Sequence, residues 1–208
     1  MHPSPTPACL VPVLLSGMES EPKRPWDSKE FSPTDPRRID HFNAAREPAH
    51  AWRASLDEED EESLQPVQPF GLKFPGLAVP PASDGPTDDR AALARLMSGR
   101  IGLVAAGRPA DTITALGWMG AVNVHQDPVI ISAVLRSWEA QWLARVVEIG
   151  FDTLTLTVGI PPPDVKTALA LAAEHFALCP DNIFQGSETL EAYAKYLIGS
   201  RTWTFWWD

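Results

Sequence analysis

The chain has 208 residues, a hydrophobic content of 44% and a net charge of −10, which predicts a globular protein with one sizeable core rather than two full domains. The negative charge has the wrong sign for binding phosphates, so we exclude nucleic acids and anionic membranes as partners. Only two cysteines are present, Cys9 and Cys179, too few for a disulfide framework and typical of a cytoplasmic protein.

The first apolar segment, Ala8 to Leu15, is interrupted by Pro12 and no Lys or Arg precedes it. Eight residues are too few to cross a bilayer, which requires about 20, and the flanks do not fit a signal peptide. We therefore expect neither a membrane span nor a targeting segment here. Met18 is a second possible start of the chain.

Proline divides the chain, because residues 1–86 hold 15 of its 21 prolines. We expect a Pro-rich, acidic and partly irregular N-terminal region over residues 1–75, then a linker with a short helix (Ala91–Met97) over 76–98, and an α+β domain over 99–208. Between Asn43 and Leu56 one helix is possible, which Pro48 would break or begin. The acidic block from Asp57 to Glu62 is typical of a solvated loop, or else a docking site for a basic partner.

From residue 100 onward helical and strand patterns alternate. Arg100–Ala105 is an expected strand, and Pro109–Leu116 an expected helix that Gly117 ends. A longer helix begins at Pro128 with Asp127 as its cap. Its apolar residues recur at three-to-four spacing, which predicts one buried face; they are Ile130, Ile131, Val134, Leu135, Trp138 and Trp142.

The remaining segments complete the pattern. Arg145–Ile149 and Thr153–Val158 predict a β-hairpin with one apolar face. Asp164 should cap a helix that ends at Pro180. Its buried residues should be Val165, Leu169, Ala172, Phe176 and Cys179. Ser187 should begin a last helix that Gly199 ends, with Leu190, Tyr193, Ala194, Leu197 and Ile198 facing inward. Thr202–Trp207 is an expected final strand. This order predicts an α+β split βαβ (ferredoxin-like) sandwich.

Chemistry is most strongly suggested around His175 and Cys179, which lie four residues apart and therefore on one side of a helix. Together with Asp181 they are candidates for a catalytic group, either as metal ligands or as a nucleophile with its base. Two residues are too few for a zinc site, and Cys179 falls on the apolar stripe. We therefore expect packing rather than chemistry, with neither metal nor cofactor.

Aromatic residues crowd the C-terminal segment. Alternation places Trp203, Phe205 and Trp207 on one face of the last strand and Trp206 on the other. The three predict a core strand, while Trp206 and Asp208 are candidates for a binding surface. On the long helix Trp138 should face inward, so Arg136 and Glu139 are expected to be surface charges and weak binding candidates. No phosphate loop, dinucleotide fingerprint, nucleophile elbow or zinc-protease motif occurs.

Several segments resemble a bacterial domain-of-unknown-function family numbered 4253. They are residues 100–104 (RIGLV), 108–111 (RPAD), 115–118 (ALGW), 133–139 (AVLRSWE), 173–182 (AEHFALCPDN) and 205–208 (FWWD). Weaker similarity extends to residues 10–17 and 24–27, which in longer relatives follow further sequence, so the chain resembles an abbreviated form. It departs from the family at Gln141–Leu143. The resemblance implies no activity, but it implies that Leu10–Leu15 is a strand of a folded N-terminal part.

The sequence leaves two functional hypotheses. The first is a non-enzymatic cytoplasmic binding or regulatory module with an unknown protein or small-molecule partner, which the missing catalytic motifs, the acidic charge and the aromatic C-terminal segment favour. The alternative is an enzyme, such as a metal-assisted hydrolase, that uses His175, Cys179 and Asp181. Burial of His175 and Cys179 would favour the first hypothesis, and an open cleft around them the second.

Overall fold

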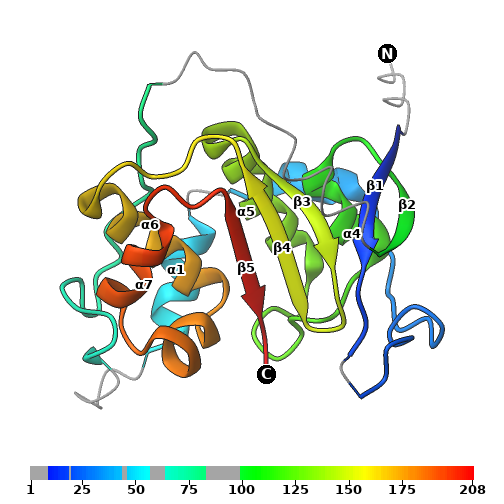
Figure 1. Ribbon diagram of the computed structural model, residues 1–208, viewed down its shortest axis with the longest axis horizontal. Helices are drawn as coiled ribbons and strands as arrows, with labels where there is room; N and C mark the ends of the chain where they lie inside the picture. Colours follow the sequence, from blue (N-terminus) through cyan, green and yellow to red (C-terminus); the bar gives the residue numbers. More distant parts are fainter. Residues whose placement is uncertain (1–8, 19, 44–45, 57–63, 83–98) are drawn as a thin grey trace.

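The structure, a computed structural model, describes residues 9–18, 20–43, 46–56, 64–82 and 99–208 (Figure 1). The acidic block Asp57–Glu62 and the expected helix Ala91–Met97 lie outside these residues. Within them, the chain forms one five-stranded mixed sheet together with several helices. The expected α+β class is confirmed.

The sheet combines a strand from the N-terminal region with four from the rest of the chain. Its strands are β1 (Cys9–Leu15), β2 (Arg100–Ala106), β3 (Ala144–Ile149), β4 (Thr153–Val158) and β5 (Thr202–Trp206), in the order β2-β1-β3-β4-β5. β1 is antiparallel to β2 and parallel to β3. The strand that the family resemblance implies at Leu10–Leu15 is therefore present, and it lies inside the sheet.

The expected ferredoxin-like arrangement is wrong in its strand order. In that arrangement the first and last strands of the unit are neighbours, whereas here β5 pairs with β4 at the edge opposite β2. β1 adds a second difference, because it lies between β2 and β3. A long-range strand insertion of this kind leaves no mark on the order of elements along residues 100–208.

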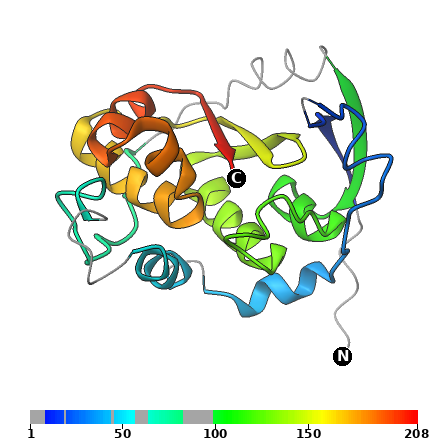
Figure 2. The same ribbon diagram turned by 90° about the horizontal axis from the view of Figure 1, so that it is seen from below.

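The described helical segments are a 3-10 turn Pro36–His41 (η1), α1 (Glu47–Ala54), a 3-10 turn Pro109–Asp111 (η2), α4 (Thr112–Leu116), α5 (Pro128–Trp142), α6 (Val165–Leu178), a π-helical turn Asn182–Ser187 (η3) and α7 (Leu190–Leu197). α4 and α5 lie along one face of the sheet, and α1, α6 and α7 gather beyond its β5 side (Figures 1 and 2). No helix in the described part of the chain has both the length and the apolar character needed to cross a membrane.

Most of the expected helix starts are confirmed by their caps. Asp127 accepts a hydrogen bond from the Val129 N–H at the start of α5, and Asp164 accepts one from the Thr167 N–H at the start of α6. These side chains satisfy backbone donors that have no partner within the helix. Pro48 lies in the first turn of α1 and begins that helix rather than breaking it. α5 ends at Trp142, and Leu143, the residue that follows, has a left-handed backbone (φ 51°).

The expected start of the last helix is wrong. Residues Asn182–Ser187 form the π-helical turn, and α7 begins only at Leu190, capped by the Thr189 hydroxyl. Two residues expected inside are exposed, Val165 by 59% and Ile198 by 37%. Each lies at a helix end, where the chain departs from the periodicity that its neighbours follow.

Aromatic side chains fill the space between the sheet and the helices. Trp138 of α5 stacks on Phe205 with ring centroids 5.5 Å apart, and Trp142 contacts Trp203 edge to face. Trp203, Phe205 and Trp207 are all buried, which confirms the expected alternation, although the strand itself ends at Trp206.

The apolar face expected on β4 is present, but the opposite face, which carries threonines, is buried as well. Thr155 and Thr157 are buried, as Leu154, Leu156 and Val158 on the other face are. The position of β4 contributes to this burial, because the strand lies in the interior of the sheet with β3 and β5 paired on its two sides.

Candidate functional site

His175 lies in the core, with no exposed surface. Its Nδ1 is 3.1 Å from the Tyr193 hydroxyl, which also accepts a hydrogen bond from the Asn182 amide. The Tyr193 hydroxyl therefore links His175 to Asn182. The other ring nitrogen, Nε2, has no hydrogen-bond partner in the described residues. The His175 ring packs among aromatic rings, with its centroid 4.7 Å from those of both Trp138 and Trp203.

Cys179 is also buried, at the C-terminal end of α6. Its thiol donates to the Trp206 carbonyl oxygen at 2.9 Å. Asn182 completes the link, because its amide donates to the Thr204 carbonyl oxygen at 2.8 Å. The segment 173–182, one of those that resemble the family, therefore fastens the end of α6 to strand β5.

The environment of these residues does not suit catalysis. Burial lowers the pKa of His175 to about 3, which makes the ring a very weak base, and raises the pKa of the Cys179 thiol to about 12, which keeps it protonated and unreactive. Asp181 is half-buried and points elsewhere, since its carboxylate accepts from the Asp208 N–H and from Gln185. The hydrolase hypothesis has no support in this geometry. Among the described residues no group of three or more His, Cys, Asp or Glu is placed to hold a metal ion.

Glu174, next to His175, is a buried acid that sequence patterns did not single out. Its two carboxylate oxygens accept hydrogen bonds from the Ala78 N–H at 2.6 Å and from the Trp138 indole at 2.8 Å. Burial nevertheless raises its pKa to about 7, against the opposing effect of these bonds. The side chain connects α6 to α5 and to the segment around residue 78.

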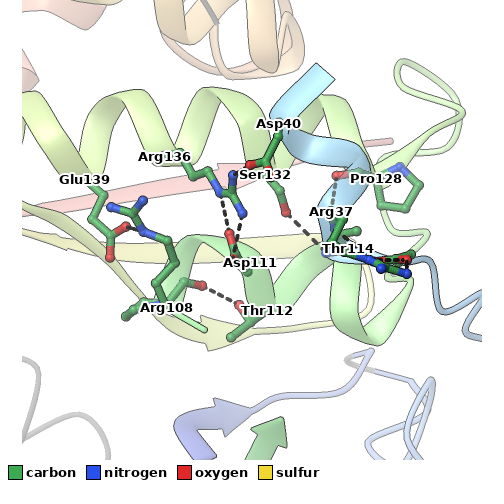
Figure 3. A network of polar contacts seen from close by, with 12 residues as sticks. Arg37, Asp40, Arg108, Asp111, Thr112, Thr114, Pro128, Ser132, Arg136 and Glu139 are labelled. Atoms are coloured by element: carbon green, nitrogen blue, oxygen red, sulfur yellow. Dashed lines mark hydrogen bonds and ion pairs between the residues drawn. The ribbon is translucent and has the colours of Figure 1, made fainter. Parts of the chain in front are cut away.

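Arg136 and Glu139 belong to a polar network on α5 (Figure 3). The Arg136 guanidinium holds the Asp111 carboxylate with two hydrogen bonds, of 2.6 and 3.0 Å, and reaches Asp40 at 2.6 Å. Glu139 pairs with Arg108 at 2.5 Å.

The expectation of plain surface charges is therefore wrong. The Arg136 and Glu139 side chains are only 22% and 14% exposed, because they reach acidic and basic partners far along the sequence. Their contacts connect α5 to η1 and to the residues around η2, a structural role.

Trp206 and Asp208 have different surroundings. Trp206 is half-buried, and its backbone N–H and carbonyl oxygen are used by Asn182 and Cys179. Asp208 is exposed and lies at the rim of a cleft.

This cleft, which we call the Trp118 cleft, has a volume of about 450 Å³, within the usual range for small-molecule sites. Its lining comes from four parts of the chain: Met18, Arg24, Pro25, Glu30, Trp118, Met119, Gly120, Val122, Asn123, Phe151, Asp152, Trp207 and Asp208.

Local geometry fixes the wall of the Trp118 cleft. Gly117 ends α4 in a left-handed conformation (φ 66°), which turns the chain so that the Trp118 indole donates to the Gly150 carbonyl oxygen at 2.8 Å. At Gly120 a Cβ atom would lie 2.2 Å from the Phe151 carbonyl oxygen, so a larger residue does not fit. The hairpin turn at Phe151 and the segment at Gly120 are thereby held in contact.

Two of the segments that carry the family resemblance, and one of weaker similarity, meet at the Trp118 cleft. They are residues 24–27, 115–118 and 205–208, which contribute Arg24, Trp118 and Asp208 among others. Sequence reasoning identified Asp208 but missed Arg24, Glu30, Phe151 and Asp152, because those residues become neighbours only when the sheet forms. The resemblance of all three segments to one family was the only signal available in the sequence.

A second hollow of about 450 Å³ lies beside α1, and its lining includes His50 and His125. The His125 ring is engaged with the protein itself, since Nε2 is 2.8 Å from the Leu178 carbonyl oxygen. Burial also lowers the pKa of His125. We therefore regard the Trp118 cleft, with its aromatic wall and exposed carboxylates, as the better candidate.

Comparison with known protein families matches residues 100–208 to a domain of unknown function (DUF4253). The match covers slightly more than half of the chain and all strands except β1. Neither the curated proteins nor the solved structures give a significant match.

Proposed function

This chain belongs to the family described as domain of unknown function (DUF4253), and from that premise we propose that it is a non-enzymatic binding or regulatory module whose ligand occupies the Trp118 cleft. One observation carries the proposal: two separate segments within the family match, 115–118 and 205–208, line one cleft of about 450 Å³ together with Arg24. Apolar walls with a few convergent polar groups are typical of ligand sites.

Three further observations support the proposal. The motif around His175 and Cys179 is accounted for by core packing and by hydrogen bonds to β5, so it requires no catalytic explanation. The two cysteines, one exposed and one buried, are unpaired, which fits the cytoplasmic location that we propose. The net charge of −10 favours a partner other than nucleic acid.

A fragment screen by two-dimensional ¹H–¹⁵N NMR tests the proposal, with cationic, neutral and anionic fragments in equal numbers. We expect amide shifts to change at Gly120, Asn123 and Phe151 when a fragment binds. Val122, 47% exposed at the cleft, offers a blocking variant: Val122→Trp should abolish these changes. Val165→Trp is the matched control, since Val165 is also exposed but lies away from the cleft. Fragments that bind Val122→Trp as well as the unmodified protein would refute the proposal.

A further inference from the structure

The Trp118 cleft carries an excess of negative charge. Its lining has three carboxylates, on Glu30, Asp152 and Asp208, and one cation, Arg24. Arg24 is already neutralised, because its guanidinium donates to both Glu30 oxygens at 2.6 and 3.0 Å. None of the ion pairs formed within the described part of the chain includes Asp152 or Asp208. Two carboxylates therefore face the cleft without a compensating cation.

The aromatic wall of the cleft already binds a cation. The Arg24 guanidinium carbon lies 4.6 Å from the centroid of the Phe151 ring, within the distance at which a cation is attracted to the face of an aromatic ring. The same guanidinium is held by the Glu30 carboxylate. The position of Arg24 thus shows that the Phe151 ring and the Glu30 carboxylate together fit a planar cation.

We propose that the ligand of the Trp118 cleft carries a protonated amine or guanidinium group on an apolar stem. The cation would approach Asp152 and Asp208, and the stem would lie against the apolar wall near Val122 and Met119. This inference rests on the proposed function, since it names the ligand class of the same cleft. An anionic ligand would instead meet the two unpaired carboxylates, which disfavours its binding electrostatically.

Arg24 then has a defined role. It occupies the Phe151 ring and the Glu30 carboxylate, which a cationic ligand would also attract. The side chain therefore competes with the ligand, and its removal should increase affinity for a cation. For an anionic ligand the same removal would decrease affinity, so the sign of the effect identifies the charge of the ligand.

Three probes of nearly equal shape test the ligand class: benzamidine, benzamide and benzoate, with charges of +1, 0 and −1. We expect benzamidine to bind most tightly in NMR titrations at low salt, with weakening as salt increases. Asp152→Asn and Asp208→Asn should each weaken benzamidine binding by up to about fivefold, as expected for a partly exposed charge pair. Glu191→Gln, which removes an exposed acid on α7 away from the cleft, is the control and should leave the affinity unchanged.

The decisive variant is Arg24→Gln, with thermal melting to verify that it is folded. It should bind benzamidine more tightly and benzoate no better than the unmodified protein does. If benzamide or benzoate binds as well as benzamidine, and Val122→Trp still blocks binding, the cation inference is wrong and the cleft remains the site. If no probe or fragment binds in the cleft, the proposed function fails too.

Discussion

Glu174 illustrates how a single buried residue connects distant parts of this fold. Its carboxylate accepts hydrogen bonds from Ala78 and Trp138, yet burial favours its protonated form. The neighbouring His175 is affected by burial in the opposite direction, toward a lower pKa. The two residues therefore give opposite contributions to the pH dependence of stability between about pH 4.5 and pH 6.5.

Glu174→Gln should separate these contributions. The pKa of Glu174 rises from 4.5 to about 7 on folding, so its protonation stabilises the folded state fully below pH 4.5, and this stabilisation is lost as the pH rises to 7. The shift corresponds to about 3 kcal/mol. The free energy of unfolding of the unmodified protein, minus that of Glu174→Gln, should therefore fall by about that amount between pH 4.5 and pH 7.

Urea unfolding at several pH values measures this difference, and Glu191→Gln provides an exposed control that should follow the unmodified protein. A difference that does not vary with pH would show that Glu174 has an ordinary pKa in the folded protein.

For single residues, the sequence predicted which side chains are buried better than it predicted their hydrogen-bond and ion-pair partners. The apolar stripe of α6 correctly suggested that Cys179 is packing. It could not reveal the bonds of Glu174, because Ala78 and Trp138 lie on other elements, and for the same reason it assigned Arg136 to the surface. Periodicity shows which side of an element is buried, whereas a polar partner depends on how elements are placed in three dimensions.

Among the elements, β5 offers the most direct test of which side chains point into the core. Trp207 is buried against Trp118, with centroids 5.4 Å apart, and its indole donates to the Leu178 carbonyl oxygen at 3.2 Å. Trp206, its neighbour, is half-buried. Trp207→Ala should therefore lower the free energy of unfolding by about 3–5 kcal/mol, and Trp206→Ala by clearly less.

Chemical denaturation of both variants checks this ranking. Should Trp207→Ala leave too little folded protein to measure, Trp207→Phe keeps a ring and loses only part of the contact. A larger loss for Trp206→Ala than for Trp207→Ala would contradict the facing of β5.

Element boundaries were predictable where a cap signals them. Asp127 and Asp164 are short acidic side chains placed before apolar periodicity, and each begins a helix as expected. The start of α7 was not predictable in this way, because Ser187 and Thr189 are both acceptable caps. The π-helical turn before α7 places Thr189 in the capping position, and no local sequence rule distinguishes the two.

At the scale of the whole molecule, β1 decides whether the sheet is complete. It pairs along its full length with β2 and lies beside β3, and its Val13 is fully buried. We therefore expect residues 99–208 to need β1 in order to form a stable sheet. The strand order was not predictable, because a parallel pairing between β1 and β3 depends on contacts that are very distant in the sequence.

A chain that begins at Met18 tests the contribution of β1. We expect it to lose cooperative thermal unfolding, because β2 would lose its one neighbour in the sheet and β3 one of its two neighbours. Val13→Asp should have a similar effect through a buried charge, whereas Leu10→Asp, at a position 60% exposed on the same strand, should be tolerated. A chain from Met18 with an unchanged melting temperature would show that β1 is not required for stability.

The insertion of β1 also has a consequence for the rate of folding. β1 is synthesised early. Its parallel partner is β3, and Leu15 of β1 pairs with Ile149 of β3. The centre of the sheet therefore cannot form until most of the chain has left the ribosome. Contacts between residues so distant in the sequence require a costly loop closure and slow the folding of a domain. We expect the remaining pairs, β3 with β4 and β4 with β5, to form first, and β1 to enter the sheet as a late step.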